Sequence, residues 1–218
     1  MEEVLSVTDE RMQRAVFFDL GGVIVREDDA LYDEFGMAHG LEPGEFYRAM
    51  YESTAGKALR LGRISREVWF EAVVEMLRDH WGSATEQTLR DWWDRPPQLH
   101  RPVLELAVEL QKAGVRIGIL SNASGDLAER LVSQFGVDLE WDVVLASGAV
   151  GLAKPDAQVY AMASERIGVP MERCFFVDDV RENVEGAVAA GMEAFLFTGD
   201  YEALRSALAA GSLPIAAG

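Results

Sequence analysis

The chain has 218 residues, with 37 acidic against 20 basic side chains, a net charge of −17 and 49% hydrophobic residues. This length and composition predict one globular core with room for an insert, and no apolar run approaches the ~20 residues of a membrane-spanning helix. The negative charge repels polyanions, so we expect no nucleic-acid partner, and because no long apolar run is present we expect no membrane partner.

The first part of the chain predicts a short strand followed by a helical insert. Residues 15–19 form an apolar run that ends in an acid, as expected for a buried strand. From about residue 28 to residue 94 there is no strand pattern, but apolar residues recur at helical spacing over 45–58, 65–81 and 85–93. Arg95, Pro96 and Pro97 then interrupt the helical pattern.

After this break, short apolar strands alternate with amphipathic helices. Helices are expected at 102–113, 126–135, 156–167, 183–190 and 201–210, and strands at 115–120, 143–146, 174–177 and 194–197. Such alternation predicts an α/β fold, a Rossmann-like parallel sheet covered on both faces. We therefore expect a core of residues 1–27 and 95–218 and a small helical cap domain of residues 28–94.

The single cysteine and the N-terminal residues predict a location for the protein. Cys174 lies in an apolar run and has no second cysteine with which to form an intramolecular disulfide, which fits a reducing compartment. Residues 1–13 are mostly polar and acidic and lack the apolar core of a signal peptide. We expect a cytoplasmic protein, either a monomer or a homodimer.

Polar residues follow the predicted strands at their carboxyl ends, where parallel sheets bring distant residues together. They are Asp19, Ser121, Asn122, Lys154, Asp178 and Asp179, with Asn183 shortly after. Clustered carboxylates suit Mg²⁺, and Lys154 can neutralise the remaining charge and contact a substrate oxyanion. Ser121 and Asn122 can donate hydrogen bonds to phosphoryl oxygens, and Asp19 can attack phosphorus.

Four motifs in this order resemble those of the haloacid dehalogenase-like hydrolase superfamily, in the branch with a small helical cap after the first strand. They are residues 18–23 (FDLGGV), 120–122 (LSN), 154–155 (KP) and 177–179 (VDD) with Asn183. The resemblance covers residues 15–210.

The resemblance implies a role for each motif residue. It makes Asp19 the nucleophile and a metal ligand, joined by the Gly21 carbonyl, by Asp179, and by Asp178 directly or through water. It places Ser121, Asn122 and the backbone of Gly21 and Gly22 beside the substrate, with Lys154 stabilising Asp19 and the phosphoryl oxygens.

Gly21 departs from the pattern of the family's phosphatases, which have an aspartate two residues after the nucleophile as general acid and base. Glycine has no side chain to transfer a proton, although its carbonyl can still bind a metal. The substrate then has a good leaving group, or another residue supplies the proton, or the protein is a weakened enzyme. The sugar-1-phosphate phosphatases of this branch, which the motif resembles, share the glycine.

These observations predict an Mg²⁺-dependent phosphatase that acts on a small phosphorylated metabolite through an aspartyl-phosphate, favouring a good leaving group such as a sugar 1-phosphate. Two alternatives stay open. One is a metal-independent 2-haloacid dehalogenase that uses Asp19 to displace halide, although dehalogenases lack the acid pair Asp178-Asp179. The other is a binding or regulatory protein that kept the fold.

Overall fold

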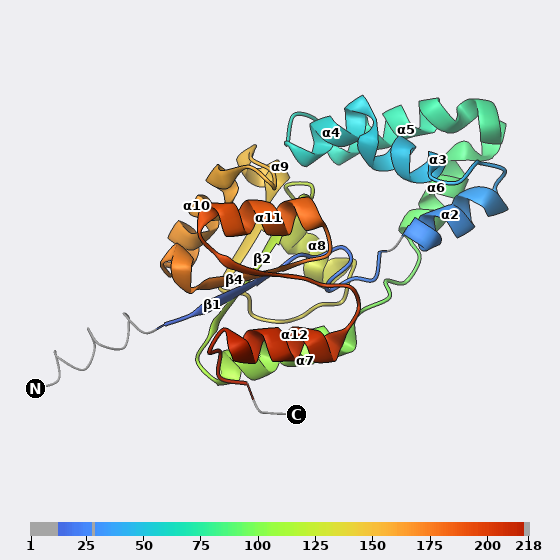
Figure 1. The fold of residues 1–218 in the computed structure, drawn as a ribbon. Helices are drawn as coiled ribbons and strands as arrows, with labels where there is room; N and C mark the ends of the chain where they lie inside the picture. The colour runs from blue at the N-terminus through green and yellow to red at the C-terminus, as the bar shows by residue number, and fades with distance from the viewer. Residues whose placement is uncertain (1–12, 28, 216–218) are drawn as a thin grey trace, which may run out of the picture.

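The computed structural model describes residues 13–27 and 29–215, so nearly all of the expected N-terminal arm lies outside the described residues. Figure 1 shows a layered α/β body joined to a helical insert. The described elements are β1 (Ala15–Phe18), α2 (Asp29–Ala38), α3 (Glu45–Tyr47), the π-helix η1 (Arg48–Glu52), α4 (Thr54–Arg60), α5 (Arg66–Trp81), η2 (Gly82–Ala84), α6 (Thr85–Trp93), α7 (Arg101–Lys112), β2 (Arg116–Ser121), α8 (Leu127–Ser133), β3 (Val143–Ala146), α9 (Ser147–Val150), α10 (Ala157–Ile167), η3 (Met171–Arg173), β4 (Cys174–Asp178), α11 (Arg181–Ala190), β5 (Glu193–Leu196) and α12 (Tyr201–Ala210).

The sheet has five parallel strands in the order β3-β2-β1-β4-β5. The central strand β1 pairs with β2 on one side and β4 on the other, with Ala15 opposite both Arg116 and Cys174. The chain therefore leaves β1 toward one edge and later returns to the other side of β1, which is where such folds form their binding crevice. The expected Rossmann-like α/β fold is confirmed.

Helices cover both faces of the sheet because each central strand is apolar on both sides. Val16 and Phe18 pack in the core cluster that also holds side chains of α7, α8 and α12, whereas Ala15 and Phe17 pack with α10 and α11. Figure 1 shows α7 and α12 below the sheet and α10 and α11 above it. The four residues of β1 are all fully buried.

The helical insert (residues 29–93) has an aromatic core of its own, separate from the two clusters of the sheet. Its buried residues include Tyr32, Phe46, Met50, Trp69 and Trp92. The expectation of one helix over 45–58 is wrong, because the chain forms α3, η1 and α4 with a break at Ser53. This residue is extended (φ −61°, ψ 162°), and its hydroxyl accepts a hydrogen bond from the Gly56 N–H as the N-cap of α4.

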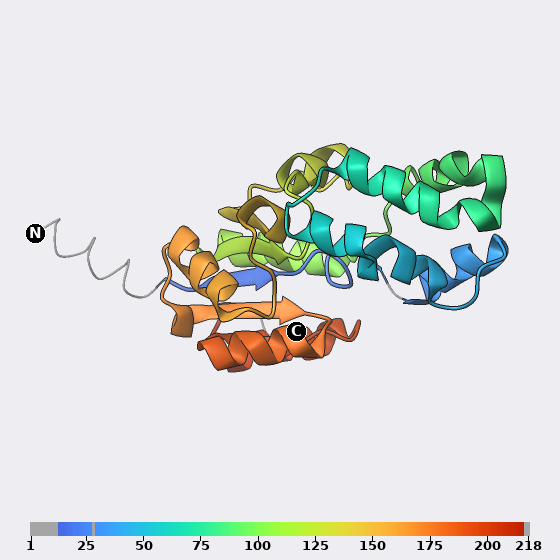
Figure 2. The same cartoon turned by 90° about the horizontal axis from the view of Figure 1, so that it is seen from above.

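Two linkers join the insert to the sheet, and they pair with each other. Val25 forms an antiparallel bridge with Leu99, and the Arg26 N–H donates to the Gln98 carbonyl at 2.7 Å. Figure 2 shows that the insert lies beyond the carboxyl ends of the strands. Among the described residues, no helix combines the length and the apolarity that crossing a membrane requires.

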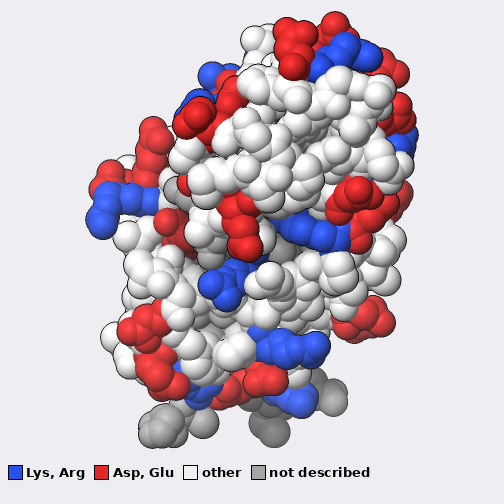
Figure 3. Space-filling view, turned by 90° about the vertical axis from the view of Figure 1, so that its right-hand side faces the viewer, with Lys and Arg blue, Asp and Glu red and all other residues white. Residues whose placement is uncertain are grey.

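The insert also contacts the body directly. Arg66 of α5 forms an ion pair with Asp126 at 2.8 Å, and the Ser147 hydroxyl donates to the Arg60 carbonyl. Acidic and basic side chains are interspersed on the face in Figure 3, which shows no continuous basic patch.

The buried hydroxyl of Tyr160 ties α10 to α11, donating to the Asn183 carbonyl at 2.7 Å. We expect Tyr160→Phe to lower the free energy of unfolding by about 0.5–1.5 kcal/mol, because a buried hydrogen bond is lost. Tyr201→Phe removes a partly exposed hydroxyl and should have a smaller effect. Urea unfolding of both variants measures the difference, and equal stabilities would contradict the prediction.

Candidate active site

Asp19 lies directly after β1 at the carboxyl edge of the sheet. Its N–H donates to the Val177 carbonyl of β4 at 2.9 Å, which extends the strand pairing by one residue. Its Oδ1 accepts from the Leu20 N–H at 2.7 Å, and only 8% of the residue is exposed. Oδ2 faces the side chain of Lys154. The carboxylate is therefore held in one orientation at the centre of the sheet edge.

Lys154 is a buried cation between two carboxylates. Its Nζ lies 3.0 Å from Asp19 Oδ2 and 2.6 Å from Asp178 Oδ2, and its side chain is 1% exposed. The Asn122 side chain holds the lysine backbone in both directions, donating to its carbonyl at 3.0 Å and accepting from its N–H at 2.9 Å. The Asn122 amide therefore positions this lysine, and the expected contact of Asn122 with substrate stays a prediction.

Asp178 ends β4, is completely buried and accepts hydrogen bonds on both oxygens. Lys154 donates to Oδ2, the Val180 N–H donates to Oδ1 at 2.7 Å, and the Asn183 amide lies 3.1 Å from each oxygen. A carboxylate has about four lone-pair sites, and these contacts use them. Asp178 therefore orients Lys154 within the site, and Asn183 in turn orients Asp178.

Asp179 completes a cluster of three carboxylates. One oxygen each of Asp19, Asp178 and Asp179 lies within 4.8 Å of the other two. The residue is exposed, and its carboxylate packs against Gly22, which has a φ of +75°. A side chain at Gly22 would collide with that carboxylate, so the glycine allows Asp179 to approach Asp19.

The electrostatics of the cluster follow from burial and crowding. Burial raises the pKa of Asp19 to about 6, with Lys154 opposing the rise and Asp178 adding to it. Although the residue is exposed, its carboxylate packs against Gly22, and the resulting desolvation, followed by repulsion from Asp19 and Asp178, raises the pKa of Asp179 to about 7. Burial lowers the pKa of Lys154, but Asp19 and Asp178 outweigh it, so the net shift is upward. One ammonium thus faces three carboxylates.

Ser121 ends β2 beside this cluster. It is 6% exposed, and its hydroxyl forms a hydrogen bond that lowers the pKa of Asp19. The structure thus brings together Asp19, Ser121, Lys154, Asp178 and Asp179 from β1, β2, β4 and the loop after α9. Gly21 and Gly22 follow Asp19 in the turn after β1.

The residue that the sequence reasoning missed is Glu27, in the first linker. A Cβ atom at Gly21 would lie 2.9 Å from Glu27 Oε2, so this carboxyl group occupies the space beside the glycine. Burial raises the pKa of Glu27 against the opposing effect of Arg95, and Asp19 is close enough to contribute to the rise. Glu27 belongs to no motif and follows Asp19 by eight positions, so only the folded chain reveals it.

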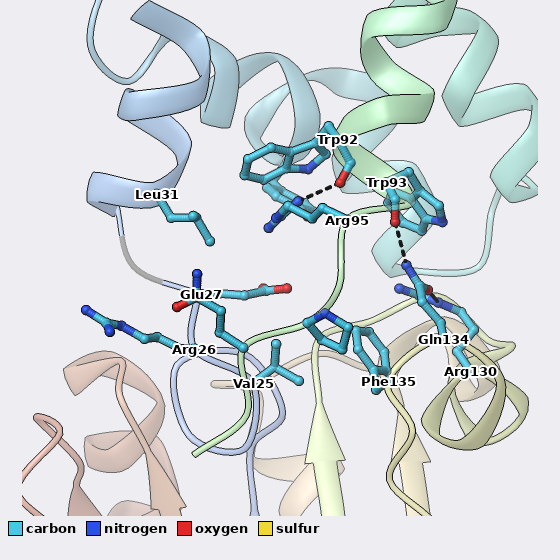
Figure 4. Close-up of a pocket in the computed structure, with 13 residues that line it drawn as sticks. Val25, Arg26, Glu27, Leu31, Trp92, Trp93, Arg95, Arg130, Gln134 and Phe135 are labelled. Atoms are coloured by element: carbon cyan, nitrogen blue, oxygen red, sulfur yellow. Dashed lines mark hydrogen bonds between the residues drawn. The ribbon is translucent and has the colours of Figure 1, made fainter. Parts of the chain in front are cut away.

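Glu27 also lines a pocket between the insert and the body, drawn in Figure 4. Its carboxyl group points into this space, below Arg95 and the ring of Trp92. The Arg95 guanidinium stacks 3.2 Å from the centre of the Trp92 ring, and Arg130 stacks on Trp93 at 4.9 Å. The pocket is therefore polar, with aromatic walls.

Comparisons with known proteins identify similar chains. A family model described as haloacid dehalogenase-like hydrolase matches residues 13–191. The phosphatase MT3486 of Mycobacterium tuberculosis is 42% identical over 98 residues, 44% of this chain, and the match spans 43% of that relative. An (S)-2-haloacid dehalogenase of Pseudomonas fluorescens is 35% identical over 68 residues, 31% of this chain and 30% of the relative. A HAD family enzyme of Bacteroides thetaiotaomicron, solved with magnesium and inorganic phosphate, shares the fold with a TM-score of 0.67 and 17% identity, covering 86% of this chain and 96% of that one.

The raised pKa of Asp179 predicts how metal-free stability depends on pH. The ordinary pKa is 3.8 and the folded value is about 7, so between them the folded state holds more protons than the unfolded state. Stability contributed by this group therefore falls as pH rises from about 4 to about 7. We expect Asp179→Asn to reduce the loss of melting temperature between about pH 5.5 and about pH 8 in the presence of a chelator.

Glu165→Gln removes an exposed acid from α10 and should keep the pH dependence of the unsubstituted protein, because it changes net charge without touching the cluster. If Asp179→Asn and Glu165→Gln reduce the pH dependence of the melting temperature equally, the cause is overall charge and not Asp179.

The close packing of Gly22 on Asp179 predicts a second outcome. We expect added Mg²⁺ to raise the melting temperature, and we expect Gly22→Ala to displace the carboxylate and to shrink this rise. Gly114→Ala is the matched control, because Gly114 has a similar φ of +83° with no atom within 4 Å of a Cβ there. Equal Mg²⁺ responses in the two variants would contradict the prediction.

Proposed function

Because the chain belongs to the haloacid dehalogenase-like hydrolases, we propose that it hydrolyses a small phosphorylated metabolite through an aspartyl-phosphate, with Mg²⁺ as cofactor. The observation that carries this proposal is the position of Asp19. Its carboxylate lies at the carboxyl edge of the sheet, with Lys154 at 3.0 Å and two further carboxylates beside it.

The donor set fits a divalent cation. Three carboxylates against one ammonium leave an excess of negative charge, and oxygen ligands are those that Mg²⁺ prefers. Asp19, Asp179 and the Gly21 carbonyl would hold the ion, while Asp178, whose oxygens are engaged by Lys154, Val180 and Asn183, would contribute its negative charge and the position of Lys154. When bound, Mg²⁺ would neutralise charge on a phosphoryl group.

Each residue of the site would have its own part in the reaction. An Asp19 oxygen attacks phosphorus, and the bond to the leaving oxygen breaks as the aspartyl-phosphate forms. Water hydrolyses that intermediate, which frees phosphate and restores the carboxylate. Lys154 holds Asp19 and offsets phosphoryl charge, and Ser121 donates to a phosphoryl oxygen. Asn122 keeps Lys154 in place.

The helical insert would act as the cap of this site, with boundaries near residues 28 and 94. Its position beyond the carboxyl ends of the strands supports this proposal, as do its contacts with the body at Asp126 and Ser147. A cap in this place would exclude water and select substrates through its lining side chains.

The acid pair Asp178-Asp179 favours a phosphatase over a metal-independent dehalogenase. Displacement of halide by Asp19 requires no cation, whereas Asp179 adds a third negative charge near the nucleophile. This arrangement is unfavourable unless a cation binds. A protein that only binds or regulates does not need a nucleophile that a buried lysine holds in place.

We expect purified protein to release phosphate from members of a metabolite panel with Mg²⁺ and to lose this activity with a chelator. Asp19→Asn should lower turnover by roughly 10³-fold or more, because the nucleophile is removed. Phosphate release at each metal concentration is the measurement, with Glu165→Gln as the surface control.

Halide release from 2-haloacids that survives the chelator would overturn the proposal in favour of a dehalogenase. An unsubstituted protein inactive on the whole panel would favour the binding or regulatory alternative. The expected preference for sugar 1-phosphates over alkyl phosphates stays a prediction, and the same panel measures it.

A further inference from the structure

Gly21 leaves a gap beside the nucleophile, and the Glu27 carboxyl group fills it. A Cβ at position 21 would lie 2.9 Å from Glu27 Oε2 and 3.7 Å from its carboxyl carbon. An aspartate at position 21 would hold its own carboxylate oxygens at a similar distance from that Cβ. The structure therefore places a carboxyl group, supplied by another residue, within reach of where the missing side chain would end.

The Tyr32 hydroxyl hydrogen-bonds to the Glu27 carboxyl group. Among the described residues, no lysine or arginine nitrogen lies within 4.0 Å of this group, so no ion pair holds it. The Arg95 guanidinium instead stacks on Trp92 and donates to its carbonyl at 2.9 Å. The Arg130 guanidinium donates hydrogen bonds to the Ser124 hydroxyl and to the Gln134 side-chain carbonyl. The two pocket cations thus have other partners.

The backbone holds Glu27 in this place. The neighbouring Arg26 N–H donates to Gln98 in the second linker, and Val25 pairs with Leu99. The carboxyl group extends from this paired segment toward the pocket between the insert and the body. Glu27 therefore lies between this pocket on one side and Gly21, two residues after the nucleophile, on the other.

We propose that Glu27 is the general acid and base of this active site, replacing the side chain that Gly21 lacks; the inference rests on the proposed phosphatase function. As Asp19 forms its bond to phosphorus, the bond to the leaving oxygen breaks and Glu27 gives its proton to that oxygen. In the second half-reaction the Glu27 carboxylate takes a proton from the attacking water. Phosphate leaves, and both carboxyl groups return to their starting states.

A proton donor at Glu27 determines the class of substrate. The leaving group can then be an ordinary alcohol, so phosphate monoesters of alcohols are substrates alongside anomeric and aryl phosphates, and Gly21 no longer requires a preference for sugar 1-phosphates. A general acid typically raises the rate of the chemical step by about 10²–10⁴-fold, and the gain is smallest where the leaving group departs as a stable anion.

The test compares Glu27→Gln with the unsubstituted protein on two probes, ethyl phosphate and 4-nitrophenyl phosphate, both with Mg²⁺. We expect kcat for ethyl phosphate to fall by about 10²–10⁴-fold and kcat for 4-nitrophenyl phosphate to fall by less than about tenfold. Glu165→Gln should change neither. Equal losses on both probes would assign Glu27 a structural role, and no loss on either would remove it from the mechanism.

A rescue experiment separates the acid from its support of the fold. Glu27→Ala removes both the acid and the crowding at position 21, and Gly21→Asp in that background returns a carboxyl group to the same place. Gly21 does not adopt the left-handed backbone, so a side chain is permitted there. We expect kcat for ethyl phosphate to be at least about tenfold higher in the double variant than in Glu27→Ala. No recovery in a folded double variant would overturn the proposal.

The two proposals fail in different ways. If Asp19→Asn abolishes Mg²⁺-dependent phosphate release while Glu27→Gln leaves the difference between the probes unchanged, the phosphatase stands and the role of Glu27 falls. If the unsubstituted protein hydrolyses neither probe nor any member of the metabolite panel, both fall.

Discussion

The buried ammonium of Lys154 is the interaction on which the site depends. It lies between Asp19, directly after β1, and Asp178, at the end of the adjacent strand β4, and Asn122, directly after β2, holds its backbone. Burying an isolated charge costs several kcal/mol, so each partner stabilises the others and removal of one leaves a buried charge unpaired. The carboxyl ends of β1, β2 and β4 are therefore joined by one cation as well as by backbone hydrogen bonds.

Lys154 alone does not balance the negative charge of the carboxylates around it. Asp179 joins Asp19 and Asp178, and the pKa of Asp19 and of Asp179 rises above the ordinary value. Gly22 permits this crowding because it carries no side chain. A site that gathers more negative charge than its lysine can balance is destabilised on its own, and a divalent cation would relieve the repulsion. Under the proposed function, this excess of negative charge would serve to bind the cation.

Much of the fold could be predicted because each element carries its own pattern. The strand at 143–146 and the helix at 85–93 have the expected bounds, since apolar runs and periodicity are local. The predicted helix over 45–58 failed at Ser53, whose hydroxyl caps a new helix. The parallel topology predicts that polar residues at the strand ends lie near one another. The hydrogen bonds between Asn122 and the Lys154 backbone join residues far apart in the sequence, so no local pattern predicts them.

Glu27 shows the limit of motif reasoning most clearly. A motif places a side chain by its distance along the chain from the nucleophile, whereas a proton needs only a carboxyl group at the right point in space. Glu27 reaches the space beside Gly21 from a linker whose course is set by the pairing of Val25 with Leu99. Both linkers also carry the helical insert. The position of the carboxyl group therefore depends on how the insert is seated, and an acid at position 21 would lack this dependence.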